Sequence, residues 1–425
     1  MATTLRIAAL QLRAHDRIHF EQAAPQLLER IAAAADGNDL LVVPEGTLPA
    51  YVLGDANVDV SATIERVRAI AQANACVIVI GAATSSERGL GNTAVVIDRD
   101  GSIAGSVDKI FLWHFDRKWF APGVSIEPVK TSIGYLGVMI CADGRMPGIA
   151  RELVDRGAEL LVMPTAWVTS GRDPANLENV QADLLARVRA FENGVPFVAA
   201  NKCGIEEAMV AYCGKSQIID SQGEVVALAS QHDEESISAT VAIGTSKPHR
   251  LPTHDPEPRK GSESAIRVVV TPFNVEIDID RRLSILDADI AVGPREEGIG
   301  ALDAFIPCIA LGQEAAFDPG MLIPYRAHGY RCVVIETVTA HPWLERVART
   351  RALELRMYVI VIEQDRRAYA IDPDGAIVCG TYGDLRMASF ALDVRRTEQT
   401  LVAPGTDIAK GLADVAALAR PSTGA

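Results

Sequence analysis

The stretch "YLGVMICADGRMPGIAR", residues 135–151, joins a buried strand, a thiol and the start of a helix. Its small and apolar run, residues 136–140, is typical of a strand in the core of a sheet. The run stops at Cys141, and the polar turn of residues 142–145 follows at once. A thiol at the end of a buried strand gains a chemical role only if the fold brings suitable partners to it, so the rest of the chain has to be searched for them.

The sequence on both sides of this stretch alternates between apolar strands and amphipathic helices up to about residue 245. Spacing of the apolar residues predicts strands at 5–12, 39–45, 76–84, 92–98, 102–109, 159–165, 196–202, 213–219, 224–230 and 236–243. It predicts helices at 20–36, 60–73, 145–157 and 176–194, and "DRDG" (98–101) is read as a hairpin turn. This alternation indicates an α/β fold in which helices cover the faces of the sheets.

The composition is that of a globular protein with two domains. The 425 residues are 48% hydrophobic and 23% charged, and the chain is too long for one typical domain. A formal charge of −14 argues against non-specific binding to nucleic acid or to an anionic membrane. No apolar run reaches the roughly 18 residues that a membrane span needs. The N-terminus lacks the pattern of a secretion signal.

The seven cysteines show neither CxxC nor Cys/His spacing. A disulfide framework and a zinc site are therefore not expected, and a reducing cytoplasmic location is predicted.

A change in amino-acid composition divides the chain. Residues 247–264 are rich in proline and charge and are predicted to be a linker between a first domain, 1–246, and a second, 265–425. A strand is predicted at 265–277. Three stretches of the second domain parallel the first in the same order: 289–297 parallels 39–47, 346–366 parallels 184–204, and 367–381 parallels 216–230. We interpret the second domain as a shorter, degenerate repeat of the first. The alternative is that α/β chains in general share similar strand–turn–strand sequences.

Two further strand ends supply partners for a thiol. Glu45 ends "DLLVVPE" just after Pro44, and Lys109 ends the strand at 102–109. Open α/β sheets display their functional groups where strands end, so Cys141, Glu45 and Lys109 are predicted to converge on one rim. Taken singly, each has a simpler interpretation: an inert core cysteine or a solvated charge.

The order and wording of these segments resemble the nitrilase, or carbon–nitrogen hydrolase, superfamily. The resemblance rests on "VVPEGTLPAY" around Glu45, "DKIFLWHF" around Lys109 and "ICADGRMPGIAR" around Cys141, with four supporting motifs between residues 91 and 227. It covers residues 4–245 and implies a four-layer αββα sandwich. It also implies that Cys141 is the nucleophile, that Glu45 is the general acid and base, and that Lys109 stabilises the tetrahedral intermediate with the backbone N–H of Ala142.

A second acid of the family stands six residues before a "PG" turn. Here that position is Asp116, one methylene shorter than the family glutamate, and it is assigned to the catalytic set. The alternative is that Asp116 pairs with a basic neighbour in "FDRKWF". Tyr51, Trp113 and Trp167 flank the catalytic motifs and are predicted, with Ala142, to bind the substrate; the alternative for these aromatic residues is packing.

The resemblance implies a hydrolase that cleaves a non-peptide carbon–nitrogen bond through a thioester and needs no metal or organic cofactor. Ala142 and Asp143 replace the Trp-Glu that usually follows the cysteine of true nitrilases, which favours an amide or N-carbamoyl substrate and release of ammonia. The alternatives are a nitrilase, a soluble acyltransferase, a glutaminase feeding a synthetase and a vestigial binding protein. The expected partner is a small molecule, not nucleic acid or a membrane, and the chain is expected to form either a homodimer or an intramolecular pseudo-dimer.

The second domain lacks the three catalytic groups at the matched positions. Arg295 stands opposite Glu45, Glu314 is predicted opposite Cys141, and the stretch that should hold the lysine is largely deleted near residues 298–307. We therefore expect this domain to be non-catalytic.

Overall fold

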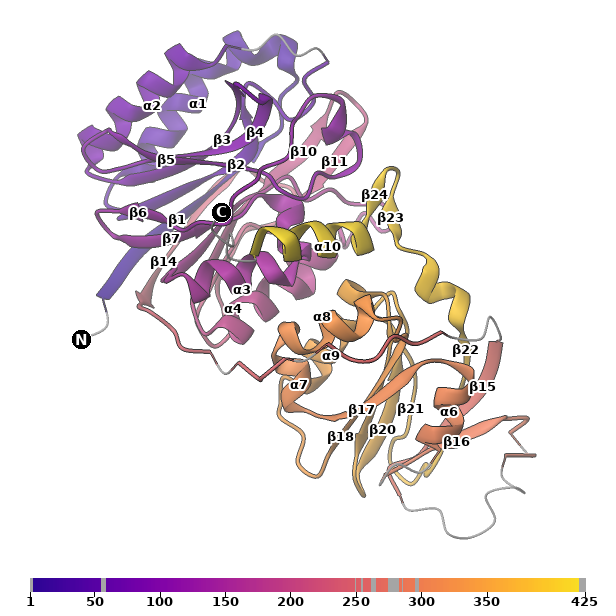
Figure 1. The fold of residues 1–425 in the computed structure, drawn as a ribbon. Coiled ribbons are helices and arrows are strands. Elements are labelled where there is room, and N and C mark those ends of the chain that lie inside the picture. The colour runs from indigo at the N-terminus through magenta and orange to yellow at the C-terminus, as the bar shows by residue number, and fades with distance from the viewer. Residues whose placement is uncertain are drawn as a thin grey trace, which may run out of the picture. The chain divides into compact units, whose positions relative to one another are not determined.

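The computed structural model describes residues 3–54, 59–248, 250–253, 255–260, 265–273, 283–284, 286–294 and 298–419. The chain forms two compact units, and Figure 1 colours it by residue number. The first comprises Met1–Pro248 together with Ala403–Thr406 and the chain from Asp414 onward, and the second comprises His249–Val402 and Asp407–Ala413. In the described part of the chain, every helix is too short or too polar to cross a bilayer.

The first unit contains a large mixed sheet of eight strands. Their order is β11–β10–β1–β2–β3–β4–β5, and β14 also pairs with β1. The strands span Thr3–Arg13 (β1), Leu40–Leu48 (β2), Val77–Ser86 (β3), Gly89–Ile97 (β4), Ile103–Asp108 (β5), Lys202–Glu206 (β10), Val210–Cys213 (β11) and Glu235–Ile243 (β14). β2 lies parallel to both β1 and β3 and is buried along its whole length; its first four residues, 40–43, form an apolar run.

A six-stranded sheet packs against the first. Its order is β13–β12–β9–β8–β7–β6. The strands span Val129–Thr131 (β6), Gly134–Val138 (β7), Leu160–Pro164 (β8), Phe197–Ala200 (β9), Gln217–Ile219 (β12) and Val225–Leu228 (β13). β2 contacts β8 and β9 of this sheet, so the two sheets lie face to face.

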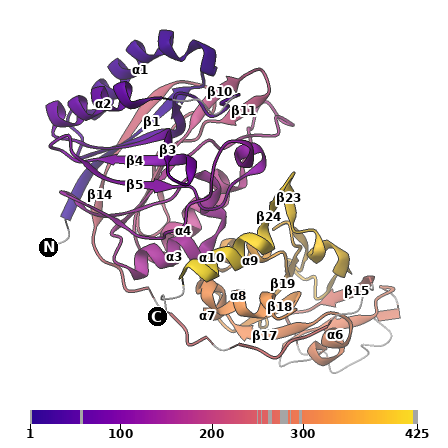
Figure 2. The same cartoon turned by 45° about the horizontal axis from the view of Figure 1, so that its top comes forward.

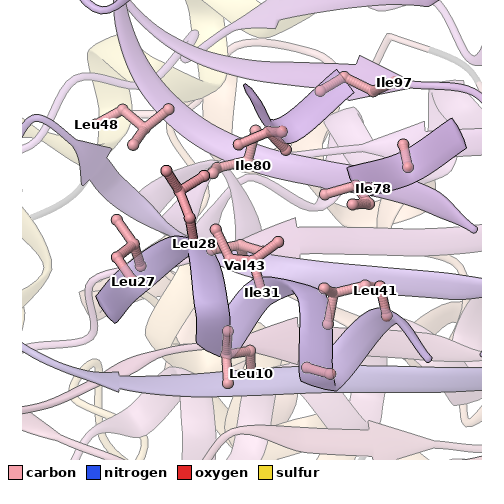
Figure 3. Packing of buried hydrophobic residues seen from close by; sticks show 14 of the residues in the cluster. Leu10, Leu27, Leu28, Ile31, Leu41, Val43, Leu48, Ile78, Ile80 and Ile97 are labelled. Atoms are coloured by element: carbon pink, nitrogen blue, oxygen red, sulfur yellow. The ribbon is translucent and has the colours of Figure 1, made fainter. Parts of the chain in front are cut away.

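Helices cover the outer faces of both sheets (Figures 1 and 2). On the large sheet these are α1 (Phe20–Ala35) and α2 (Ser61–Asn74), and on the small sheet α3 (Pro147–Asp155) and α4 (Ala186–Asn193). Figure 3 shows Leu27, Leu28 and Ile31 of α1 packed over the apolar residues of β1 to β4. Their spacing places them on one face of the helix. The predicted four-layer αββα sandwich is confirmed.

Two predicted strands are wrong because each contains a switch between sheets. The stretch 196–202 divides at Asn201 into β9 of the small sheet and β10 of the large one. The stretch 213–219 ends β11 and begins β12, with Gly214 and Lys215 at φ of 61° and 60° between them. The Asn201 side-chain amide donates to the Gly214 carbonyl at 2.7 Å and ties the two switch points together.

Two predicted helices are shorter than expected. The predicted helix 145–157 begins only at Pro147, after a 3-10 helix over Cys141–Arg145. The predicted helix 176–194 consists of a π-helical turn, Gln181–Leu185, followed by α4.

The second unit has its own core between a three-stranded and a five-stranded sheet. The first has the order β16–β15–β22, with Ala265–Val270 (β15), Ile290–Val292 (β16) and Ala388–Asp393 (β22). The second runs β17–β18–β19–β20–β21, with Cys308–Gly312, Cys332–Thr337, Tyr358–Glu363, Arg367–Ile371 and Ile377–Gly380. The strand predicted at 265–277 ends at Val270, and residues 274–277 lie outside the described residues.

The remaining elements of the C-terminal half are helices and a short ribbon. They are α6 (Ile299–Phe305), α7 (Glu314–Phe317), α8 (Pro319–Ala327), α9 (Leu344–Leu355), a 3-10 helix (Val394–Glu398), β23 (Leu401–Ala403), β24 (Thr406–Asp407) and α10 (Ile408–Ala419). Thr406 accepts a hydrogen bond from the His114 N–H at 2.7 Å, which agrees with the inclusion of residues 403–406 in the first unit.

Candidate active site

A buried lysine between two carboxylates forms the centre of the site. The Lys109 Nζ lies 2.8 Å from Glu45 Oε1 and 2.7 Å from Asp116 Oδ2, and all three side chains are 0% exposed. Glu45 lies within β2, Lys109 directly follows β5, and Asp116 lies in a 3-10 helix over His114–Lys118. Burial alone lowers the lysine pKa, but the carboxylates of Asp116 and Glu45 outweigh it and raise that pKa well above its usual range. The ammonium therefore stays charged.

Asp116 accepts two more hydrogen bonds. The Tyr51 hydroxyl donates to its Oδ1 at 2.9 Å, and the Trp113 backbone N–H donates to its Oδ2 at 2.9 Å. Arg117 and Lys118, the basic neighbours in the sequence, are exposed. Asp116 thus pairs with Lys109, not with an adjacent base, and connects the lysine to the side chain of Tyr51.

The two oxygens of Glu45 differ in their surroundings. Oε1 accepts from Lys109 and from the Asn92 Nδ2, at 2.7 Å, whereas the buried Oε2 has no hydrogen-bond partner among the described residues. Gly46, at φ 56°, turns the chain directly after Glu45; a Cβ there would lie 2.6 Å from the Tyr51 Cα. Lys109 and Asn92 therefore orient the carboxylate and leave one oxygen able to accept a proton.

Cys141 is held in a strained conformation at the start of the 3-10 helix over Cys141–Arg145. Its φ is 46°, in the left-handed region that non-glycine residues rarely adopt. Burial and then the Glu45 carboxylate raise the pKa of this thiol to about 12, whereas Lys109, the Thr165 hydroxyl and the Ala166 N–H lower it. At neutral pH Cys141 is therefore a protonated thiol, which would need a base before it could act as a nucleophile.

Asp143 connects the cysteine segment to the lysine segment. Its carboxylate accepts backbone N–H bonds from Phe111 at 2.7 Å, Ile140 at 3.0 Å and Ile110 at 3.1 Å. Ile110 follows Lys109, and Ile140 precedes Cys141. Burial raises the pKa of Asp143 to about 7, and the three N–H donors act in the opposite direction. This carboxylate fixes the ends of two chain segments that are about thirty residues apart in sequence.

The residues predicted to bind substrate have different environments. Tyr51 is buried and its hydroxyl is used by Asp116. Ala142 is buried beside Cys141. Trp167 is buried, and its indole Nε1 has no partner among the described residues. Trp113 is half-buried, and the Arg145 guanidinium lies 4.6 Å from its ring centroid. Contact with a substrate stays a prediction for all four.

Sequence reasoning missed three polar residues of this site: Asn92, Asp143 and Arg145. Asp143 and Arg145 lie in the motif around Cys141, and Asn92 lies in one of the supporting motifs. Arg145 has a buried Nε without a hydrogen-bond partner among the described residues, and burial lowers its pKa to about 10. Spacing alone did not reveal these roles, because each depends on a contact with a distant segment.

Known proteins are similar to part of this chain. A probable nitrilase of Schizosaccharomyces pombe is 37% identical over 159 residues, which are 37% of this chain and 56% of the relative. A hydrolase encoded in the pqqF 5' region of Pseudomonas protegens is 35% identical over 225 residues, covering 51% of this chain and 76% of that protein. The chain thus spans little more than half the length of the yeast relative.

A solved structure and a family model match the same part of the chain. The crystal structure of an amidase from Nesterenkonia sp. matches 56% of this chain and 90% of that one, with a TM-score of 0.50 and 25% identity. The carbon-nitrogen hydrolase model matches residues 6–250, which are more than half of the 425 residues. This range includes Glu45, Lys109, Asp116 and Cys141. The chain belongs to the carbon-nitrogen hydrolase family.

Proposed function

We propose that this protein hydrolyses the amide bond of a small molecule through a thioester on Cys141. The observation that carries the proposal is the arrangement of Glu45 beside a thiol whose pKa is about 12: its Oε1 is held by Lys109, while its Oε2 has no hydrogen-bond partner in the described part of the chain. A protonated nucleophile next to an oriented base is the arrangement that nucleophilic catalysis requires. In a purely structural ion pair, buried carboxylate oxygens normally have hydrogen-bond partners. A buried oxygen that has none among the described residues therefore favours a functional role.

The steps follow from these groups. Glu45 takes the thiol proton as the Cys141 sulfur attacks the amide carbon, and the oxygen of that carbonyl becomes anionic. Lys109 and the Ala142 N–H stabilise this oxyanion. Glu45 then returns the proton to the nitrogen, the carbon–nitrogen bond breaks, and ammonia leaves. Water, deprotonated by Glu45, attacks the thioester, and the released sulfur regains a proton as the carboxylic acid departs.

Arg145 supports an anionic group on the substrate. Its guanidinium lies against the Trp113 ring, its buried Nε has no partner among the described residues, and the Cys141 sulfur is close enough to influence its pKa. A buried positive charge that has no counter-ion among the residues the structure describes is costly, and a substrate carboxylate would offset that cost. We therefore propose a small amide or N-carbamoyl compound that also carries a carboxylate.

We also propose that the second unit is a non-catalytic copy of the first. The order β17 to β21 repeats the order β7–β8–β9–β12–β13. Two buried arginines support the match: Arg189 donates to the Gly144 carbonyl, and Arg351 donates to the Ala316 carbonyl. Equating these carbonyls places Gln313 opposite Cys141, one residue before the predicted Glu314. Arg295, predicted opposite Glu45, lies outside the described residues.

Ammonia release from a panel of amides, ω-amides, N-carbamoyl amines and nitriles tests the proposal. Each amide is supplied as a pair that differs only in a distant carboxylate or methyl group, such as succinamate and butyramide. We expect release from amide or N-carbamoyl compounds, faster for the anionic member, and none from Cys141→Ala. Release only from nitriles would favour a nitrilase. Ammonia release accompanied by acyl transfer to an added amine, in place of the free carboxylic acid, would favour the acyltransferase.

A further inference from the structure

A second buried ion pair lies beside the catalytic set and is not part of it. The Lys202 Nζ lies 2.9 Å from Glu206 Oε2, and the two side chains are 1% and 0% exposed. Both residues belong to β10, four positions apart, so their side chains lie on the same face of the strand. The Tyr212 hydroxyl of β11 donates to Glu206 Oε2 at 2.8 Å. A buried pair of this kind adds little net stability, so its contacts have to be considered for another role.

The pair holds both ends of the segment between Glu45 and Val52. Lys202 Nζ donates to the Gly46 carbonyl at 2.8 Å, directly after Glu45. Glu206 Oε1 accepts the Val52 N–H at 2.6 Å, directly after Tyr51. One charged group of the pair therefore fixes the backbone next to the general base, and the other fixes the backbone next to the tyrosine.

The middle of this segment has its own contact. The His15 Nε2 lies 2.6 Å from the Pro49 carbonyl oxygen, and burial together with the nearby Lys202 lowers the pKa of His15. Tyr51 connects this segment to the site, because its hydroxyl donates to Asp116, the second partner of Lys109. The Tyr51 ring also lies 6.4 Å from the Tyr212 ring, centroid to centroid.

We propose that Lys202 and Glu206 are positioning residues of the reaction, an inference that rests on the proposed amide hydrolysis. They hold Glu45 and Tyr51 in register with Lys109 and Asp116 by fixing the backbone at Gly46 and Val52. Neither side chain takes a proton from the reacting atoms. Their effect is on geometry, for which a displacement of about 1 Å is enough to cost on the order of 100-fold in rate.

The test compares Lys202→Met, Glu206→Gln and Lys202→Arg in the full chain with Arg351→Met as a matched control. Arg351 forms an equally buried ion pair with Glu354 in the second unit, 1% exposed on both sides. Three quantities are measured: kcat and KM on the amide that the panel identifies, the rate of Cys141 alkylation by iodoacetamide, and the thermal midpoint. Alkylation is located by peptide mass spectrometry and needs no knowledge of the substrate.

We expect Lys202→Met and Glu206→Gln to lower kcat by about 10- to 100-fold, with KM changed less than about threefold. Both variants should slow Cys141 alkylation at pH 7, because Glu45, the base that assists it, is displaced. Lys202→Arg should retain part of the alkylation rate and kcat that Lys202→Met loses. Arg351→Met should leave kcat and the alkylation rate unchanged, even if it lowers the thermal midpoint as much as the variants of Lys202 and Glu206 do.

Wild-type kcat and alkylation in both variants would overturn the proposal, as would an equal loss in Arg351→Met. If the wild type releases no ammonia from any amide, the proposed function fails. The alkylation rates would then still decide whether Lys202 and Glu206 position Glu45 relative to Cys141.

Discussion

Replacing Asp116 by asparagine removes one of the two carboxylates that flank the buried Lys109 ammonium. The side chain keeps its shape, so the change isolates the charge. Asparagine can still accept a hydrogen bond from Tyr51 or Trp113, but it cannot pair with Lys109 as an anion. We expect a loss of stability and, separately, a loss of rate.

The contacts set the size of both losses. At 2.7 Å and an effective dielectric constant of about 20, the Lys109–Asp116 attraction is about 6 kcal/mol before desolvation is counted. Breaking one side of a buried pair costs about 3–5 kcal/mol, and because Lys109 keeps Glu45 at 2.8 Å we expect the lower end, about 3 kcal/mol. For a unit of this size that lowers its thermal midpoint by about 6–12 °C.

The expected rate loss comes from Lys109. Removing a group that stabilises an oxyanion costs about 100- to 1,000-fold in kcat, and here the ammonium remains but loses one of its two anchors. We therefore expect kcat for Asp116→Asn to fall about 100-fold, measured as ammonia release below the melting range. Asp116→Glu, which restores the length of the family acid, should recover most of it. A kcat for Asp116→Asn within about threefold of wild type, with an unchanged midpoint, would refute this account of the lysine.

Three further predictions concern neighbouring groups. Asp143→Asn places an amide NH₂ towards at least one of three backbone N–H donors, because Phe111 and Ile110 donate to one carboxylate oxygen and Ile140 to the other, so urea unfolding should show a loss of about 2 kcal/mol; unchanged stability would contradict the role assigned to Asp143. Ultraviolet absorbance of wild type minus Cys141→Ala should show no thiolate from Cys141 at neutral pH; since its pKa is raised from 9.0 to about 12, the stability it contributes is present below pH 9 and is lost as pH rises towards 12. A thiolate signal at neutral pH would disprove the protonated nucleophile. Arg145→Met should raise KM for anionic amides at least about 10-fold and leave neutral amides nearly unchanged; an equal effect on both would remove the carboxylate from the proposed substrate.

The layers of the fold could be predicted because the first unit repeats one simple pattern. β8 and the first half of β2 are apolar runs buried on both faces, and α1 has a clear apolar stripe. The switches between sheets at Asn201 and Gly214 could not be predicted in the same way. The apolar runs are interrupted there only by short polar stretches, 201–202 and 214–217, which a single strand can also contain. The pairing of the strands in the structure shows that the chain changes sheets at these points.

The residues of the site also fall into two groups, those that the sequence indicated and those that it did not. Glu45, Lys109, Asp116 and Cys141 could be selected because each was expected at a strand end or at a fixed distance from a turn. Glu45 lies within β2 and not at its end, and the structure brings the first three into direct contact. Their catalytic roles stay predictions. Asp143, Lys202 and Glu206 act on backbone groups that are distant in sequence, so no local pattern indicates them.

Direct detection of an acyl group on Cys141 tests the central claim. Glu45 activates both the thiol and the water in this mechanism, so the wild type is mixed with an excess of the amide that the panel identifies, quenched with acid within the first turnover and analysed by mass spectrometry for the thioester. We predict that the peptide containing Cys141 gains the mass of the acyl group, that one equivalent or less of ammonia accompanies it, and that Cys141→Ala gains nothing. Turnover by Cys141→Ala, or an acyl group on any other residue, would contradict the mechanism.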